Sequence, residues 1–186
     1  MFLLGASIGS FINVIVYRVP LKKSIVFARS KCIQCEYQLA WFDNIPILSW
    51  FLLFGKCRKC KANISINYPI IEFLTALLFV LNLYSRPTFY IDAPFLLTRI
   101  LGLVLIFISI CLSLFDLNFY WLPSYITSNG LFVGLISSLF IGIYEGYNFK
   151  YFLSSLLAAL LGYLIFLALR IFGEKIFNKP VLGKGD

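Results

Sequence analysis

The sequence has 186 residues, of which 61% are hydrophobic, 18% are aromatic and only 13% are charged. Water-soluble domains carry about 25% charged residues, so this composition excludes an ordinary soluble enzyme and indicates an all-α polytopic membrane protein. The formal net charge is +8, but nine of the sixteen basic residues lie between Arg18 and Lys61, beside an apolar start. Such clustering is typical of contact with anionic lipid, and we therefore predict a lipid bilayer and no nucleic acid as partner.

Five segments approach the length of about 20 mostly apolar residues that a membrane-spanning helix needs. In chain order they are residues 1–17, 68–84, 93–115, 125–144 and 151–169. The first segment also has the length of a signal peptide, but its positive charge follows the apolar run, which favours a transmembrane helix. Glu72 lies inside the second segment. We expect it to face a polar groove or to pair with a basic residue, because an unpaired charge in lipid is costly.

The distribution of Lys and Arg predicts the orientation of these five helices. Nine basic residues lie in the loop of residues 18–67 and four follow the last predicted helix, whereas the loops on the other side carry one each. Loops rich in Lys and Arg stay in the cytoplasm. We therefore predict that the N-terminus is outside, and that the 18–67 loop and the segment after the last helix are inside.

The 18–67 loop carries two C-x2-C pairs, Cys32 with Cys35 and Cys57 with Cys60, and 21 residues separate the pairs. Four thiolates in this pattern suit tetrahedral Zn²⁺, and a small loop with a thin core gains stability from a metal. We predict a structural zinc site in a zinc-ribbon-like cytoplasmic loop. Four thiols without metal, structural or redox-active, are the alternative.

The stretch between the two cysteine pairs, WFDNIPILSWFLLFGK, is aromatic and apolar. Its Trp41 and Trp50 either pack inside the zinc-ribbon-like loop or belong to an amphipathic stretch that lies in the membrane interface, and the sequence leaves both possibilities open. The two acidic residues of the loop, Glu36 and Asp43, are predicted to be solvated.

The chain has no histidine, so acid–base chemistry would fall to carboxylates, Lys, Tyr or Cys. Asp116 ends the third predicted helix and Asp186 closes the motif GKGD, both on the predicted cytoplasmic face. Two carboxylates at close range share one proton: the ionised one takes a proton from water, and the protonated one donates to a carbonyl oxygen, as in aspartic proteases. The alternative is that they are two unrelated acids at the membrane interface.

Together these motifs resemble those of the bacterial type IV prepilin peptidases, which are GxGD-type membrane aspartic proteases and N-methyltransferases. The resemblance rests on GSFINVIVYRVP (residues 9–20), the cysteine region (30–76), FDLNFYWLP (115–123) and GKGD (183–186). It implies that Asp116 and Asp186 are the catalytic pair of a bacterial inner-membrane enzyme. Such an enzyme cleaves the leader peptide of type IV prepilins or type II secretion pseudopilins at the cytoplasmic face. It then methylates the new N-terminus with S-adenosyl-L-methionine.

Three features depart from the family pattern. Ser124 stands where the family usually has an aspartate, the first cysteine pair lacks the frequent proline, and the family continues beyond G-x-G-D with further membrane helices. We therefore expect a first helix (1–17), a cysteine loop (18–67) and a protease domain that is truncated at its C-terminus (68–186).

Two functions compete with the peptidase. One is a catalytically inactive, truncated membrane zinc protein in pilus or type II secretion assembly. The other is a membrane thiol redox protein that uses the two C-x2-C pairs. The predicted orientation disfavours the redox protein, because it places the thiols in the reducing cytoplasm.

Overall fold

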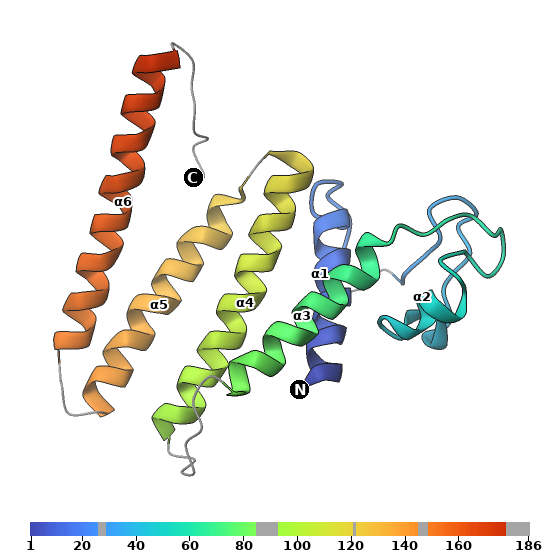
Figure 1. Cartoon of the computed structure of the whole chain (residues 1–186), viewed down its shortest axis with the longest axis horizontal. Helices are drawn as coiled ribbons and strands as arrows, with labels where there is room; N and C mark the ends of the chain where they lie inside the picture. The colour runs from blue at the N-terminus through green and yellow to red at the C-terminus, as the bar shows by residue number, and fades with distance from the viewer. Residues whose placement is uncertain (26–28, 85–92, 121, 145–148, 178–186) are drawn as a thin grey trace. The chain divides into compact units, whose positions relative to one another are not determined.

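The computed structural model describes residues 1–25, 29–84, 93–120, 122–144 and 149–177, and these residues are mostly helical (Figure 1). The elements in chain order are α1 (Phe2–Arg18), the 3-10 helix η1 (Trp41–Asn44), α2 (Leu48–Leu52), α3 (Asn67–Tyr84), α4 (Ala93–Phe119), α5 (Ser124–Tyr144) and α6 (Lys150–Phe177). Within the described residues there is no β-sheet, only two isolated β-bridges. The predicted all-α fold is confirmed.

Within the described part of the chain, four helices, α3 to α6, are long and apolar enough to cross a membrane, judged by length and composition. Helix α1 is mostly apolar but shorter, at 17 residues, and it ends at Arg18. All five predicted segments are therefore helical, and the chain is a multi-pass membrane protein. The predicted orientation of the helices in the membrane stays a prediction.

Two helices extend beyond the apolar segments from which they were predicted. Helix α4 ends at Phe119 instead of residue 115, and α6 ends at Phe177 instead of residue 169. In α6 the helix continues past Arg170, whose Nε donates to Oε1 of Glu174 one turn later, at 3.0 Å. A charged residue thus ends the apolar run without ending the helix, because helical backbone bonds do not depend on apolar side chains.

The chain divides into two compact units. The first unit comprises Met1–Thr88 with Ser109–Cys111, and the second comprises Phe89–Ile108 with Leu112–Asp186. The first unit contains α1, α3 and the segment between them, residues 19–66, which we call the cysteine module. The division into three parts that the sequence suggested stays a prediction.

In the first unit, α1 and α3 cross at two glycines, Gly5 and Gly9. A Cβ atom added to Gly5 would lie 2.6 Å from the Cα of Ala76, and one added to Gly9 would lie 2.7 Å from the Cα of Glu72. The G-x-x-x-G spacing places both glycines on one face of α1, so the two backbones approach closely, as in many membrane helix pairs. This crossing brings the last turns of α1 close to the start of α3, where Asn13 donates to the carbonyl of Tyr68.

In the second unit, α5 and α6 pack against each other. Most of their large apolar side chains are exposed, including Phe132 and Phe140 of α5 and Leu161 and Phe172 of α6. Such an apolar helix surface is stable in lipid, where burial against other protein is not required to remove it from water. The exposed apolar surface therefore agrees with a membrane location for this unit.

Candidate metal centre, cavity and carboxylate sites

The cysteine pairs lie in two turns of the same construction, residues 31–38 and 56–63, which we call the first and second knuckle. A β-bridge closes each turn. The N–H of the first cysteine donates to the carbonyl five residues later in both, at 2.9 Å for Cys32 and 2.8 Å for Cys57. The residue after the second cysteine has a left-handed backbone in both, with φ of 54° and 60°. The paired cysteines are evident in the sequence, but the repeat of the backbone around them is not.

The two knuckles face each other, so the four cysteines predicted as ligands come together. Their Sγ atoms all lie within 4.8 Å of one another. The closest pairs join the two knuckles: Cys32 to Cys60 at 3.8 Å and Cys35 to Cys57 at 3.9 Å. A tetrahedral Zn–S bond of about 2.3 Å implies an S–S separation of about 3.8 Å. The four thiols are therefore placed to bind one tetrahedral metal ion.

The knuckle backbone and the clustered thiols shift the pKa values of two of the cysteines in opposite directions. The backbone N–H groups of Cys35 and Gln34 point at the Cys32 sulfur and lower its pKa to about 6. The N–H of Ala62 lowers the pKa of Cys60, but desolvation and the three neighbouring thiols outweigh it and raise that pKa to about 11. Four sulfurs at this spacing cannot all be anionic without a cation between them, which agrees with a metal site.

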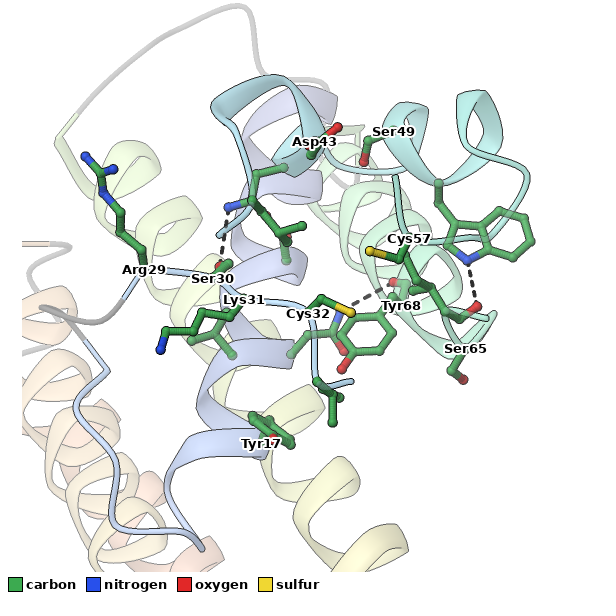
Figure 2. Close-up of a pocket in the computed structure, with 18 of the residues that line it drawn as sticks. Tyr17, Arg29, Ser30, Lys31, Cys32, Asp43, Ser49, Cys57, Ser65 and Tyr68 are labelled. Atoms are coloured by element: carbon green, nitrogen blue, oxygen red, sulfur yellow. Dashed lines mark hydrogen bonds between the residues drawn. The ribbon is translucent and has the colours of Figure 1, made fainter. Parts of the chain in front are cut away.

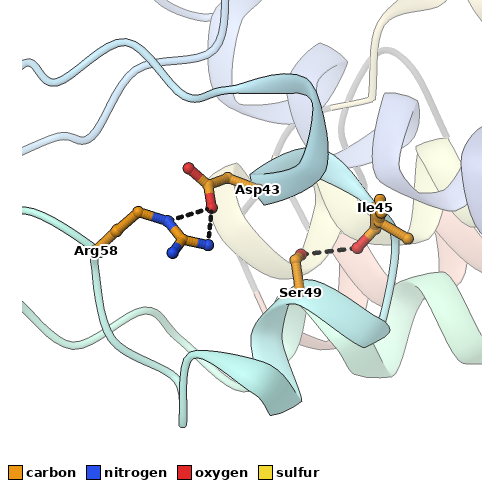
Figure 3. Close-up of polar contacts among 4 residues, drawn as sticks. All are labelled: Asp43, Ile45, Ser49 and Arg58. Carbon is orange, nitrogen blue, oxygen red and sulfur yellow. Dashed lines mark hydrogen bonds and ion pairs between the residues drawn. The ribbon is translucent and has the colours of Figure 1, made fainter.

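An ion pair ties the second knuckle to η1 (Figure 3). Both Nε and Nη2 of Arg58 lie 2.8 Å from Oδ1 of Asp43, and this hydrogen bond raises the pKa of Arg58. The Asp43 side chain is only 1% exposed, so the prediction that this residue is solvated is wrong. Glu36 is exposed, as predicted. The sequence gives little sign of the pair, because the two residues are 15 positions apart.

Glu72 joins the cysteine module to α3. Its buried carboxylate accepts a hydrogen bond of 2.6 Å from the backbone N–H of Ile47, and the Ser10 side chain also bonds to it. Ile47 has a φ of 64°, and the N–H of Leu48 donates to the carbonyl of Pro46 across it, at 2.6 Å. This is a rare three-residue turn, and the left-handed region is strained for a β-branched residue. Among the described residues, Glu72 therefore pairs with the backbone and with Ser10, and with no basic side chain.

Arg18 forms a second connection, between the end of α1 and the start of the cysteine module. Its guanidinium donates to the backbone carbonyls of Ser24, Ile25 and Arg29, at 3.1 to 3.3 Å. Although Arg18 is charged, its residue is only 8% exposed. The bonds from Arg18 and to Glu72 hold the module against both helices of the first unit.

A cavity of about 810 Å³ lies where the module meets α1 and α3. Figure 2 shows side chains of all three parts around it. Its wall includes Asn13 and Tyr17 of α1, Tyr68 and Glu72 of α3, and Asp43 and Trp50 of the module. A polar groove at Glu72 was one of the two alternatives predicted from the sequence, but the contribution of the module to a cavity there was not predicted.

The two tryptophans of the cysteine module have different surroundings. Trp50 donates from Nε1 to the carbonyl of Ile64 at 3.1 Å. Its ring packs so closely on Gly55 that an added Cβ would lie 2.8 Å from it, and Gly55 has a φ of +65°. Trp41, in contrast, is 80% exposed. Trp50 therefore packs within the module, as one of the two alternatives proposed, whereas Trp41 lies on its surface.

Of the two predicted catalytic carboxylates, the structure describes one. Asp116 lies near the C-terminal end of α4, where its backbone carbonyl accepts a hydrogen bond from the N–H of Tyr120 at 2.9 Å, and the residue is exposed. Asp186 lies outside the described residues. Ser124 is the first residue of α5, and its carbonyl accepts a hydrogen bond of 2.9 Å from the Thr127 hydroxyl. Pairing of Asp116 with Asp186 stays a prediction.

Comparison with known protein families divides the chain at a similar place. The Bacterial Peptidase A24 N-terminal domain matches residues 3–86, and the Type IV leader peptidase family matches residues 103–186. The first match contains the metal centre and the cavity, and the second contains Asp116 and Asp186. No solved structure matches the chain.

Several curated proteins are similar over nearly the whole chain. A prepilin leader peptidase/N-methyltransferase of Myxococcus xanthus is 38% identical over 100% of this chain and 52% of its own length. A type 4 prepilin-like proteins leader peptide-processing enzyme of Escherichia coli is 33% identical over 98% of this chain and 70% of its own length. A prepilin leader peptidase/N-methyltransferase of Klebsiella pneumoniae is 31% identical over 100% of this chain and 78% of its own length. The chain thus spans about half to three quarters of these relatives.

Proposed function

The chain belongs to the family of prepilin leader peptidases/N-methyltransferases, and from this premise we propose that it is a membrane aspartic endopeptidase and N-methyltransferase. Its substrates are type IV prepilins or pseudopilins, whose leader peptide it cleaves at the cytoplasmic face before it methylates the new N-terminus. The observation that carries the proposal is similarity over both halves of the chain, from the cysteine region to GKGD, to relatives named for both activities.

In the proposed cleavage step, Asp116 and Asp186 act on one water molecule. One carboxylate is ionised and takes a proton from the water, which attacks the scissile carbonyl carbon. The other is protonated and donates its proton to the carbonyl oxygen as the tetrahedral intermediate forms. Because two close carboxylates cannot both ionise readily, the pair titrates as a unit and keeps one proton. The lack of histidine in the chain is compatible with this mechanism.

The four cysteines would hold Zn²⁺ in the cysteine module. A site with four protein thiolates has no open position for water or substrate, so the metal would have a structural role. It would hold the two knuckles together, and the bonds of Glu72 and Arg18 would then transmit this order to the membrane helices. The methyl group would come from S-adenosyl-L-methionine, which supplies an electrophilic methyl carbon to the substrate amine.

The proposed location is the bacterial inner membrane, with the N-terminus outside and the cysteine module and both aspartates on the cytoplasmic side. The concentration of basic residues in the 18–67 loop and after residue 169 supports this orientation. The substrates are anchored in the same membrane and present their basic leader to that face, so cleavage and methylation are proposed on the same side.

Leader cleavage by purified full-length protein in lipid vesicles tests the proposal. With a prepilin substrate, Asp116→Asn and Asp186→Asn are each expected to reduce cleavage by about 10³-fold or more, because each removes one partner of the acid–base pair. Glu174→Gln, which changes a half-buried acid of α6 that pairs with Arg170, is the matched control and should cleave normally. Normal cleavage by either aspartate variant would reject the catalytic pair. Zinc binding by a wild-type protein that cleaves no prepilin would favour the inactive zinc protein instead.

A further inference from the structure

The two short helices of the cysteine module, η1 and α2, expose large apolar side chains. The helices contact each other, so these side chains come from neighbouring elements. Phe54, in the turn after α2, is 86% exposed, and Trp41 of η1 is 80% exposed. The set of exposed apolar side chains, which we call the apolar face, is Trp41, Phe42, Leu48, Phe51, Leu52 and Phe54. Clustered apolar side chains on a surface usually mark contact with a partner.

The backbone at Phe54 shows that its exposure is built into the turn. Helix α2 ends in a Schellman motif, in which the N–H of Gly55 donates to the carbonyl of Trp50 at 2.9 Å. The N–H of Phe54 donates to the carbonyl of Phe51 at 3.0 Å. Phe54 thus occupies the left-handed position of the motif, with a φ of 51°, where glycine is the usual residue. The strain of a bulky residue at this position has a function if the exposed ring contacts a partner.

The second knuckle, which follows α2 directly, adds positive charge beside the apolar face. Its basic residues are all exposed: Lys56, Arg58, Lys59 and Lys61. The guanidinium of Arg58 lies over the Phe42 ring, 5.0 Å from its centroid, so charged and apolar groups are in contact. Of the two acids of the module, Asp43 is buried against Arg58 and Glu36 belongs to the first knuckle. The surface beside the second knuckle is therefore positively charged.

The attachment of the module to α3 fixes where the apolar face lies. Helix α3 has 18 residues and a length of about 27 Å, so the whole helix is needed to cross a hydrocarbon core of about 30 Å. Its first two turns therefore lie at the membrane boundary. Glu72, in the second of these turns, accepts a bond of 2.6 Å from the N–H of Ile47, the residue before α2. Helix α2 thus begins beside the boundary end of α3, within reach of lipid headgroups.

We propose that the apolar face and the basic second knuckle bind the surface of the surrounding bilayer. The aromatic rings and Leu side chains enter the interface, and the Lys and Arg side chains contact anionic phospholipid headgroups. Surfaces that combine Trp, Phe and Leu with Lys and Arg bind membranes in this way. The contact goes beyond the proposed peptidase and methyltransferase activities and does not depend on them. It holds the second knuckle, and with it the metal centre, at the membrane surface.

Photolabelling by lipid tests the location of this contact without any substitution. Full-length protein is reconstituted without prepilin in vesicles of phosphatidylcholine and phosphatidylglycerol that contain a phospholipid with a photoreactive group near its headgroup. Mass spectrometry then identifies the labelled peptides, and we expect label on residues 41–55. Absence of label from these residues would overturn the proposal. If they instead crosslink to a second copy of the chain, or to added prepilin, the face belongs to that partner and the proposal is wrong.

Phe54→Gly separates lipid contact from folding. Glycine favours the left-handed position, so this variant should match or exceed the wild type in zinc content and protease resistance. The yield of lipid label on residues 41–55 should nevertheless fall by about threefold, because a strongly exposed ring is lost. Ile33→Ala is the matched control, since Ile33 is 69% exposed but lies in the first knuckle, and its labelling should equal that of the wild type. Unchanged labelling of Phe54→Gly, or loss of zinc from it, would overturn the assignment of Phe54 to lipid.

The charge of the lipid gives a further test. The wild-type protein should be labelled more strongly in vesicles with phosphatidylglycerol than in phosphatidylcholine alone, and high salt should reduce the difference. Lys56→Gln combined with Lys59→Gln removes two exposed charges and should also reduce it. Lys150→Gln, at the start of α6, is the control and should preserve the difference. Equal labelling of the wild type in both kinds of vesicle would overturn the anionic headgroup as partner.

Discussion

Different kinds of interaction stabilise each of the two units internally. In the first unit, glycines allow α1 and α3 to cross closely, four thiols converge, and Glu72, Arg18 and an ion pair attach the cysteine module. In the second unit, α5 and α6 are apolar over most of their surface, and lipid can cover what they expose. The module lies between two membrane helices and is too small to have a large core, so individual residues decide its structure.

This comparison predicts that substitutions at contact residues of the first unit have large effects, whereas similar substitutions at open positions of the second are tolerated. The largest effect is expected at the metal centre. Cys57→Ser should abolish stoichiometric zinc binding and unfold the module, because one of four ligands is lost at a buried position. Cys111→Ala, at another buried cysteine, is the control. Zinc content and limited proteolysis of the purified proteins measure the result, and full zinc content in Cys57→Ser would contradict it.

The helix crossing should be the next most sensitive feature. Gly9→Leu is expected to destabilise the first unit by about 3 kcal/mol, because its side chain would meet the backbone of α3. Gly134→Leu in α5 should have little effect, since a Cβ there meets nothing within 4 Å in the described part of the chain. Unfolding in increasing SDS compares the two variants. Equal loss of stability would show that the first unit is no more closely packed than the second.

The ion pairs of the two units differ in burial, so the loss of each pair should have a different effect on zinc affinity and stability. Arg58→Ala leaves the buried Asp43 carboxylate without its partner and should lower zinc affinity by about tenfold, since Arg58 lies inside the second knuckle. Arg170→Ala breaks the pair with Glu174, in which the two side chains are 43% and 38% exposed, and should change neither zinc affinity nor stability measurably. Competition with a chromogenic chelator gives the zinc affinities, and an unchanged affinity in Arg58→Ala would count against the proposed support of the knuckle by η1.

The smallest effect concerns the two knuckles alone and appears only without metal. The pKa of Cys32 is lowered to about 6 and that of Cys60 is raised to about 11, so at pH 7 Cys32 is mostly thiolate and Cys60 is mostly thiol. Iodoacetamide should therefore alkylate Cys32 first in zinc-free protein, and the preference should fall as the pH drops through about 6 and protonates Cys32. Mass spectrometry of samples taken at early times shows the order in which the cysteines are alkylated. Faster alkylation of Cys60 at pH 7 would contradict the described arrangement of N–H groups.

Much of the fold could be predicted from the sequence, because hydropathy and helix length are local properties. The five apolar segments are helices, and the two C-x2-C pairs converge. The helix ends were less predictable, since Arg170 and Asp116 interrupt the apolar pattern without interrupting backbone hydrogen bonds. Asp43 was predicted to be solvated, and this was wrong because no local pattern indicates its partner, Arg58, 15 positions away.

What the sequence determined by itself is thus the chemistry available: apolar helices, four thiols, two candidate catalytic carboxylates and an excess of positive charge on one predicted face. The tertiary structure decided which of these groups meet. The bond from Ile47 to Glu72 joins residues 25 positions apart, and the cavity forms only where the module lies against α1 and α3. These contacts depend on how closely the backbones of α1 and α3 approach and on the bond by which the Glu72 carboxylate holds the strained turn at Ile47. Neither property can be read from a local pattern of residues.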